Sequence, residues 1–547
     1  MGRPGAFLTV GRRAHELRSV DERVRDYEEL YVEPDEGERR AQASRCMMCG
    51  VAFCQAGISF GGARPSGCPL HNLIPEWNDL VYRGLWREAA DRLAMTSPLP
   101  EFTSRVCPAL CEASCNLGCG DEAETIHDNE RAISDWEWAH GGPRAFPPAA
   151  PDARRVAVVG SGPAGLACAW ELARRGLRVR VVDRADRAGG LLTYGIPNMK
   201  LPKDVVARRV ALMEKLGIEF CLSTNAAEKG VAADLVGSSD AVVIACGARR
   251  PRGLAVPGFE EGLAAGGVAW AVDYLSESTR ALLDAREPKT SARGLDVVVI
   301  GGGDTGNDCL GTAVRQGARS LAQLEFLPRP AEPGPGVTRW PEWPATLKTD
   351  YGQQEAIELV GGEVRSWGVD TLEVLLGRDG RVRGLRVADL DWSGGRPERL
   401  AGSEREIHAQ LVLVACGFVG PERDVLDALG VEVGERGLPT CEPDTHRGRT
   451  AGETPVFLAG DARTGSTLVV SAIADAMACA GEVAAALGPR MGEKSLPEVI
   501  WLEDGREVPF EPAEPPRRWL EESLEWASGD AREEEPPEDG PTELVWL

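Results

Sequence analysis

The 547-residue sequence lacks the long apolar runs of membrane proteins and the leader of secreted ones. No run approaches the roughly 20 apolar residues that span a bilayer. The first residues, MGRPGAFLTVGRRAHELRSV, contain no apolar stretch typical of a secretory signal. We therefore expect a cytoplasmic protein with no membrane partner.

Basic residues are scarce relative to acidic ones. Lysine and arginine total 61, aspartate and glutamate total 85, and the formal net charge is −24. Nucleic-acid binding depends on basic surfaces that neutralise phosphates. We therefore expect no nucleic-acid partner.

Paired cysteines are absent beyond residue 119. The seven cysteines there are scattered singly, and none belongs to a C-x-x-C motif, which argues against a redox-active dithiol. We expect them to be small buried side chains: Cys168, Cys221, Cys246, Cys309, Cys416, Cys441 and Cys479.

The chain is too long for one core and predicts three or four domains. Residues 1–145 mix short helical patterns with cysteine groups and contain no convincing strand, so a mostly α-helical domain is expected. The link GGPRAFPPAAPDA separates it from the rest. Residues 491–547 are acidic and proline-rich, and we expect this extension to be partly mobile.

The segment RRVAVVGSGPAGLACAWELARRGLRVRVVD has the pattern of a strand, a glycine turn, an amphipathic helix and a second strand. Gly160, Gly162 and Gly165 fit the G-x-G-x-x-G motif in the context that it needs. A helix N-terminus at such a turn favours a pyrophosphate. Asp183 follows at the end of the second strand, where it can bind ribose hydroxyls. The alternative, a glycine-rich turn in an ordinary α/β domain, is less favoured because strand, helix and acid are all present.

A second unit, beginning at LDVVVIGGGDTGNDC, repeats the motif with Gly301, Gly303 and Gly306. Two such units imply two dinucleotides. Asp304 and Thr305 could contact the second one, or could equally well cap the start of the helix. The runs AVVIACG, LVLVACG and PVFLAGD predict further buried strands at 241–247, 411–417 and 455–461. The sequence therefore predicts an α/β fold with two Rossmann-like domains.

Eight of the 15 cysteines lie between residues 46 and 119. In RVCPALCEASCNLGC a cysteine recurs at every fourth position. On one continuous helix the first and last would be roughly 18 Å apart, whereas a zinc ion binds thiolates at about 2.3 Å. Either the helix breaks or these cysteines serve more than one centre. Soft thiolates suit iron–sulfur clusters, and zinc sites are the serious alternative.

Several motifs carry a family resemblance. Two Rossmann units and a late AGD resemble the two-dinucleotide flavoprotein reductases. RCMMCGVAFC, PEFTSRVCPALCEASC, GGLLTYGIPNMKLPK, WPEWP and GSTLVVSAIADA resemble the small (β) subunit of bacterial glutamate synthase, from about residue 20 to residue 490. The resemblance implies an iron–sulfur domain at 1–145. It also implies an FAD domain at 152–288 and 419–490, interrupted by an NAD(P)H domain at 289–418.

The resemblance also implies binding residues. FAD is expected at Gly160, Gly162, Gly165, Asp183, Gly190, Leu191, Gly460, Asp461, Val469 and Val470. NAD(P)H is expected at Gly301, Gly303, Asp304, Thr305, Gly306 and Arg329. The family mostly uses NADPH, whose 2′-phosphate Arg329 could pair with. Glu325 would instead favour NADH, because a carboxylate binds a 2′-hydroxyl and repels a phosphate.

For the cysteine block the resemblance implies two [4Fe–4S] clusters. The first would be bound by Cys46, Cys49, Cys54 and Cys115. The second would be bound by Cys68, Cys107, Cys111 and Glu130. Cys119 competes with Glu130, since clusters prefer thiolate to carboxylate. Glu130 is nevertheless favoured as the ligand, and the alternative for it is an ordinary solvated carboxylate in the first turn of a helix.

The implied function is electron input. NAD(P)H would give a hydride to FAD, and single electrons would pass through the clusters to a large subunit that makes glutamate from glutamine and 2-oxoglutarate. The hydride chemistry belongs to the cofactors, so no protein acid, base or nucleophile is assigned. The alternatives are an oxidoreductase that serves ferredoxin or another acceptor subunit, and a scaffold that only docks a partner.

Overall fold

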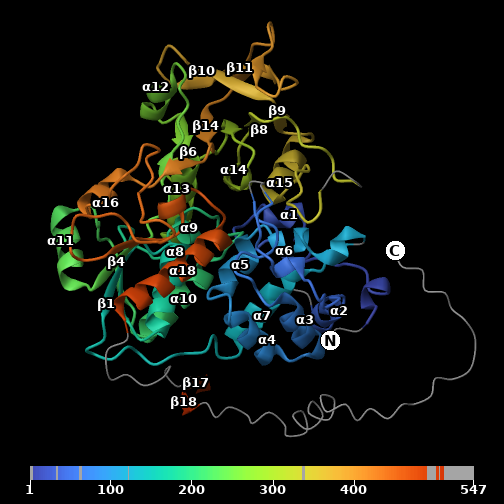
Figure 1. Ribbon diagram of the computed structural model, residues 1–547. Coiled ribbons are helices and arrows are strands. Elements are labelled where there is room, and N and C mark those ends of the chain that lie inside the picture. The colour runs from blue at the N-terminus through green and yellow to red at the C-terminus, as the bar shows by residue number, and fades with distance from the viewer. Residues whose placement is uncertain are drawn as a thin grey trace, which may run out of the picture.

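The computed structural model describes residues 4–32, 35–60, 64–120, 122–334, 339–488, 500–503 and 506–509. It has the predicted α/β fold with a helical N-terminal domain (Figure 1). The predicted mobile extension at 491–547 lies outside the described residues, except for the hairpin of β17 (Ile500–Glu503) and β18 (Arg506–Pro509).

The N-terminal domain contains helices and no strand among its described residues up to 145. Asp35 begins the second helix by accepting the N–H of Glu38, and Gly84 ends the third in the left-handed conformation. The α-helices are α1 (Val20–Arg23), α2 (Glu36–Ala43), α3 (Ile74–Arg83), α4 (Trp86–Ala94), α5 (Pro100–Val106), α6 (Leu110–Ala113) and α7 (Ile126–Ala139). The 3-10 turns are η1 (Ala6–Leu8), η2 (Phe53–Gln55) and η3 (Asn116–Cys119).

The first sheet is parallel, in the order β16-β4-β1-β2-β3. Its strands are β1 (Arg155–Val159), β2 (Arg178–Val182), β3 (Glu219–Cys221), β4 (Ala241–Ile244) and β16 (Val456–Leu458). The chain returns to this sheet after more than 200 residues, so the first Rossmann domain is interrupted, as predicted. Its helices are α8 (Pro163–Arg174), α9 (Leu191–Tyr194), α10 (Lys203–Lys215), α11 (Lys229–Ser238), α16 (Arg423–Ala428), α17 (Asp461–Thr464) and α18 (Val469–Leu487).

The second sheet is also parallel, in the order β6-β14-β7-β8-β9. Its strands are β6 (Val268–Trp270), β7 (Asp296–Ile300), β8 (Ser320–Glu325), β9 (Arg365–Trp367) and β14 (Leu411–Val414). Its helices are α12 (Phe259–Ala264), α13 (Ala271–Leu283), α14 (Asp304–Gln316) and α15 (Tyr351–Val360). Strand β6 thus belongs to the second sheet although it precedes residue 289, where the second domain was expected to begin.

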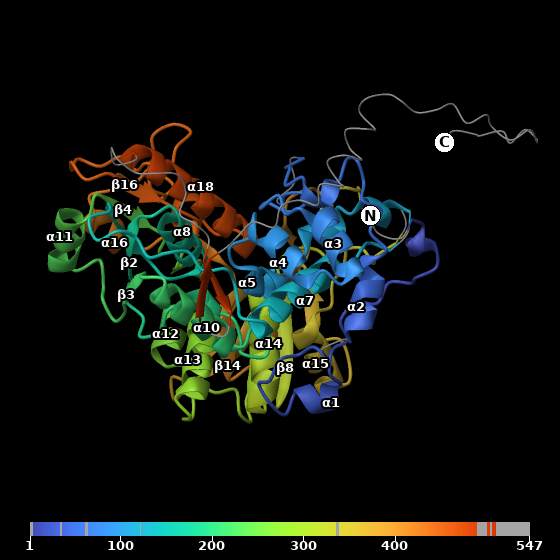
Figure 2. The same cartoon turned by 90° about the horizontal axis from the view of Figure 1, so that it is seen from below.

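An antiparallel sheet extends the second domain at the top of Figure 1. It consists of β10 (Val369–Leu376), β11 (Val382–Asp391), β12 (Glu398–Arg399) and β13 (Arg405–His408). The short antiparallel pair of β5 (Arg250–Pro251) and β15 (Phe418–Gly420) joins the two crossings between the Rossmann domains. Figure 2 shows the helices of the N-terminal domain packed against both Rossmann domains, with α1 beside α15.

Helix α18 corrects the expectation that no apolar run is long enough to span a bilayer. It has 19 residues and a mean hydropathy of 1.5, enough by length and composition. One face is buried in the core of the first domain, where α18 packs against α8. It is one such helix in the described part of the chain, and it is therefore weak evidence for a membrane span.

Candidate functional site

The three glycines of the first turn differ in their surroundings. Gly160 has φ +107°, and a Cβ there would lie 2.5 Å from the Ala245 carbonyl oxygen. A Cβ on Gly165 would lie 1.9 Å from the Gly160 oxygen, so that glycine lets α8 approach β1. A Cβ on Gly162 would meet no atom within 4 Å. The space beside Gly162 is therefore open to a ligand at the N-terminus of α8.

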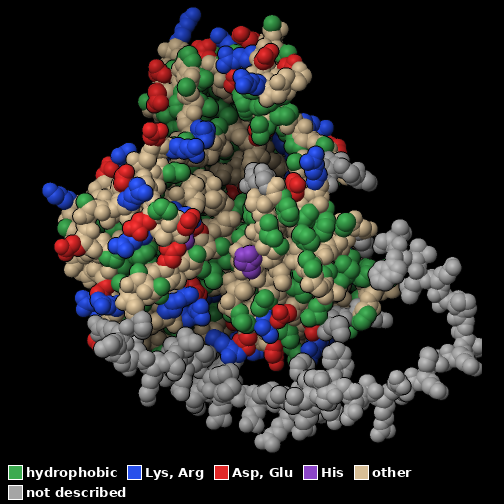
Figure 3. All heavy atoms as spheres, in the orientation of Figure 1, with side chains coloured by type: hydrophobic (Ala, Val, Ile, Leu, Met, Phe, Trp, Pro, Cys, Tyr) green, Lys and Arg blue, Asp and Glu red, His purple; other side chains and the backbone are tan. Residues whose placement is uncertain are grey.

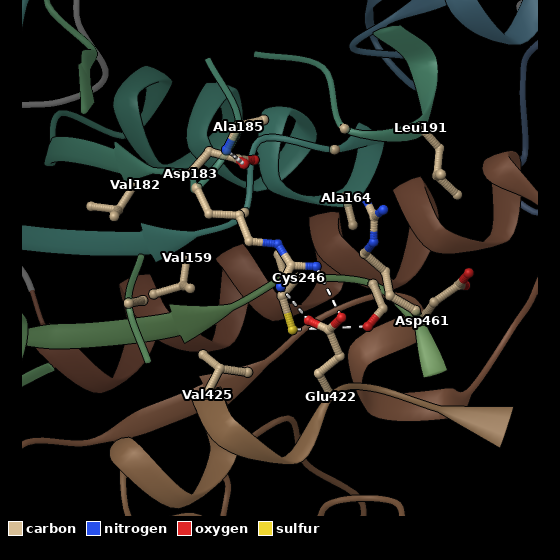
Figure 4. A pocket seen from close by; sticks show the side chains of 18 of the residues that line it. Val159, Ala164, Val182, Asp183, Ala185, Leu191, Cys246, Glu422, Val425 and Asp461 are labelled. Carbon is tan, nitrogen blue, oxygen red and sulfur yellow. Dashed lines mark hydrogen bonds and ion pairs between the residues drawn. The ribbon is translucent and has the colours of Figure 1, made fainter. Parts of the chain in front are cut away.

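Asp183 lies beside this turn, in a pocket between the carboxyl ends of the first sheet and α16 (Figure 4). Its Oδ2 accepts the Ser161 N–H at 2.7 Å, and its Oδ1 accepts the Ala185 N–H at 2.8 Å. The same pocket is lined by Gly160, Gly162, Gly190, Leu191 and Asp461. The structure thus brings together six of the ten residues expected to bind FAD, in a cleft whose wall at Gly162 has room for the pyrophosphate.

The other four FAD candidates do not line this pocket. Gly165 is packed beneath the turn, and Gly460 is bonded through its N–H to Asp475 Oδ2 at 2.7 Å. Burial raises the pKa of Asp461 to about 6, although two hydrogen bonds from Thr467 act in the opposite direction. Val469 and Val470 form the first turn of α18.

The second turn repeats the geometry of the first. Gly301 has φ +119°, with a Cβ position 2.4 Å from the Ala415 oxygen, and a Cβ on Gly306 would lie 2.3 Å from the Gly301 oxygen. A Cβ on Gly303 would meet nothing within 4 Å. Asp304 and Thr305 open α14 behind Gly303, and the structure records no side-chain cap there.

A second pocket lies between the Rossmann domains and is lined by Thr305, Trp270 and Phe418 among others. It shares Arg249 and Glu422 with the first pocket. Sequence reasoning missed both residues, because no local motif marks them. Glu422 also pairs with Arg184 across the first pocket. Arg184 could have been identified from the sequence, because it directly follows Asp183.

The cysteine stripe, the four cysteines that recur at every fourth position from Cys107 to Cys119, does not lie on one helix. Cys107 follows α5 and precedes Pro108, Cys111 lies in α6, Cys115 precedes η3, and Cys119 ends it. Proline disfavours helical backbone at the preceding residue, and Cys107 is extended, with ψ 138°. Pro108 was the sequence signal for this break.

Two small cavities divide the thiols. One is lined by Cys46, Cys49, Cys54 and Cys115. The other is lined by Cys68, Cys107, Cys111 and Glu130. Cys119 lines neither cavity and is exposed. The structure thus brings the candidate ligands together in the two sets that the resemblance implied.

Burial dominates the electrostatics of both cavities. It raises the pKa of Cys46, Cys68 and Cys107 to about 12. It also raises the pKa of Glu130 to about 7, and the hydrogen bond from Thr103 Oγ1 at 2.6 Å lowers it by less. Glu130 is therefore buried, and the alternative of a solvated carboxylate is wrong. Ionised thiolates in such sites require a bound positive charge.

In the part of the chain that the structure describes, no group of three or more His, Cys, Asp or Glu side chains is close enough to hold one metal ion. The two cavities are lined by seven cysteines and Glu130 among other residues. Soft thiolates are the ligands that suit iron–sulfur clusters.

The cavities adjoin each other and the first Rossmann domain. Ile74 and Ile126 line both, and Val470 of α18 lines the one with Glu130. Trp340 lies against the other: its indole N–H donates to the Cys115 oxygen at 3.1 Å, and its ring contacts Phe53 edge-on. Trp340 therefore packs on the cysteine domain.

Comparisons with known proteins agree with this architecture. Residues 23–142 match the family described as dihydropyrimidine dehydrogenase domain II, 4Fe-4S cluster. Residues 154–338 match the pyridine nucleotide-disulphide oxidoreductase family. The first match spans all the candidate cluster ligands and confirms the prediction of an iron–sulfur domain over zinc sites.

Relatives cover most of the chain. The glutamate synthase [NADPH] small chain of Bacillus subtilis is 40% identical over 505 residues, which are 91% of this chain and 100% of the relative. Glutamate synthase [NADH] of Schizosaccharomyces pombe is 40% identical over 487 residues, which are 87% of this chain but 22% of the relative. Among solved structures, Mycobacterium tuberculosis FprA in complex with NADPH has a TM-score of 0.46 and 18% identity, covering 61% of this chain and 85% of that one. The chain belongs to the family of glutamate synthase small chains.

Proposed function

We propose that this chain is the electron-input subunit of a glutamate synthase. It oxidises NAD(P)H and delivers electrons to a large subunit that makes glutamate from glutamine and 2-oxoglutarate. When bound, FAD accepts a hydride and the two [4Fe–4S] clusters carry single electrons. The protein holds these groups in sequence and excludes water between them. We expect the complex to be cytoplasmic.

The observation that carries the proposal is the position of α18. Val470 in its first turn lines the cavity of Cys68, Cys107 and Cys111, and Ala472, two residues further on, lines the first pocket. Two redox sites that meet the same helix within two residues make a short path for electrons. A scaffold that only docks a partner would have no need of this arrangement.

We assign the roles of the candidate residues as follows. The first glycine turn, Asp183, Gly190, Leu191, Gly460, Asp461, Val469 and Val470 hold FAD. The second turn, Asp304 and Thr305 hold the nicotinamide nucleotide. Cys46, Cys49, Cys54 and Cys115 bind one cluster, and Cys68, Cys107, Cys111 and Glu130 bind the other. The corresponding domains are the iron–sulfur domain at 1–145 and the FAD domain around an inserted nucleotide domain.

The exit toward a partner lies at the first cluster cavity. Cys49 is partly exposed, and the loop around it carries the exposed apolar side chains of Met47, Met48 and Val51. Figure 3 shows apolar side chains gathered on the side of the molecule where α1 and α6 lie in Figure 1. An exposed apolar patch favours an interaction site. In the Schizosaccharomyces pombe relative the matched region is 22% of a longer chain, which is consistent with a large partner.

The test is glutamate formation with anaerobically purified protein. With NADH or NADPH, glutamine and 2-oxoglutarate, glutamate should appear only when a glutamate synthase large subunit is added. Reduction of ferredoxin at a comparable rate, with no glutamate in the presence of the large subunit, would favour a different acceptor. Failure to oxidise either nucleotide would exclude electron input altogether.

A further inference from the structure

Glu325 ends β8, and its carboxylate is fixed beneath the second glycine turn. Oε2 accepts the N–H of Gly302 at 2.6 Å, and Oε1 accepts the N–H of Leu327 at 3.0 Å. A Cβ on Gly302 would lie 2.3 Å from Oε2, so glycine at this position leaves room for the acid. Two backbone N–H groups therefore hold the Glu325 carboxylate in place next to the second glycine turn.

Asp183 occupies the corresponding place in the first Rossmann unit. Its carboxylate accepts the N–H of Ser161, the residue between the first two glycines of that turn, and the N–H of Ala185, two residues after the acid. Glu325 makes the same two kinds of bond, to Gly302 and Leu327. The adenosine ribose of FAD carries a free 2′-hydroxyl, which can donate a hydrogen bond to a carboxylate. The second unit reproduces this hydroxyl-binding geometry.

Two arginines beside Trp367 are already paired. Trp367 is the β9 partner of Glu325, and Arg329 and Arg365 lie over its ring at 5.3 and 5.1 Å. Arg329 pairs with Glu332. Arg365 pairs with Glu363 and donates to the Lys348 oxygen. A 2′-phosphate near Trp367 would have to displace Glu332 from Arg329 and would still face the charge of Glu325.

We propose that the second dinucleotide site selects NADH over NADPH and that Glu325 determines the choice. The inference rests on the proposed function and names its electron donor. It reverses the expectation that Arg329 binds a 2′-phosphate. The Glu325 carboxylate accepts a hydrogen bond from the ribose 2′-hydroxyl of NADH, whereas it repels the phosphate that NADPH carries on this 2′-oxygen.

The first experiment compares kcat/KM for NADH and NADPH in the full chain with FAD and clusters bound, using ferricyanide as electron acceptor. The native protein should favour NADH by about tenfold or more, the effect of one charge-dependent contact. Glu325→Gln keeps the side-chain size and removes the charge, so the preference should shrink by about tenfold. Glu332→Gln is the matched control: it frees Arg329 but leaves Glu325 in place, and NADH should remain preferred.

The second experiment measures binding without turnover. ADP and 2′,5′-ADP differ only in where the second phosphate lies, and calorimetry gives the affinity of each. The native chain should bind ADP more tightly, and Glu325→Gln should strengthen 2′,5′-ADP while ADP binding shows that the site is folded. A native preference for NADPH and 2′,5′-ADP, or no response to Glu325→Gln, would overturn the inference. If neither nucleotide is oxidised, the proposed function fails, and the binding measurement still decides the role of Glu325.

Discussion

Single glycines in the dinucleotide turns have separable effects. Gly165→Ala would place a Cβ 1.9 Å from the Gly160 oxygen, whereas Gly162→Ala would place one in open space. We expect Gly165→Ala to lower the free energy of unfolding of the FAD-free protein by about 1–3 kcal/mol, as overpacking does. Gly162→Ala should leave that stability unchanged, because its backbone is extended, but should lose FAD. Thermal unfolding of the FAD-free protein and flavin-fluorescence titration separate the two, and equal losses of stability would contradict the assignment.

At the residue scale the structure also sharpens the choice between Glu130 and Cys119. Glu130 lines the cavity of Cys68, Cys107 and Cys111, and Cys119 is exposed outside it. Glu130→Ala should therefore alter the electron paramagnetic resonance signal or the oxygen sensitivity of one cluster. Cys119→Ser, the matched control, should leave both clusters unchanged. The opposite pattern would assign the eighth ligand to Cys119.

At the scale of elements, α1 ties the cysteine domain to α15 of the nucleotide domain. Glu355 is fully buried and accepts from Arg23 at 2.7 Å and from Arg315 at 2.5 Å. Removing one partner leaves buried charges without compensation, which costs about 3–5 kcal/mol. Glu355→Ala should therefore lower the urea midpoint markedly, and it should speed proteolysis near residue 23.

Exposed Glu358 lies in the same helix and supplies the control. Glu358→Ala should change stability by less than about 0.5 kcal/mol. Equal midpoints for the two variants would show that the contact between α1 and α15 contributes little.

Elements were predictable where local pattern decides them. The strands β4, β14 and β16 formed where the apolar runs indicated. The break in the cysteine stripe could have been predicted from Pro108, because proline disfavours helical backbone at the preceding residue. Contacts such as Arg184 with Glu422 join residues 238 positions apart, and no local pattern encodes them. The same holds for the buried pair of Arg23 and Glu355.

At the scale of the whole molecule, the candidate sites form an ordered series. The first pocket lies at the turn of β1 and α8, and helix α18 supplies Ala472 to this pocket and Val470 to the cavity of Glu130. Ile74 and Ile126 line both that cavity and the next one. The last cavity opens beside Cys49 and the exposed Met47. Under the proposed function, nucleotide oxidation and electron delivery for glutamate formation would depend on opposite ends of the series.

Cys46→Ser separates these two activities. Cys46 lines the last cavity, remote from the first pocket in the series, so its loss should leave FAD content and nucleotide oxidation with ferricyanide close to native. Glutamate formation with the large subunit should fall at least tenfold, and iron content should drop by about four per chain, one cluster's worth. Cys221→Ser, in the FAD domain and outside both cavities, should affect neither activity. If Cys46→Ser lowered iron by that amount and still supported native glutamate formation, electrons would leave the chain by another route.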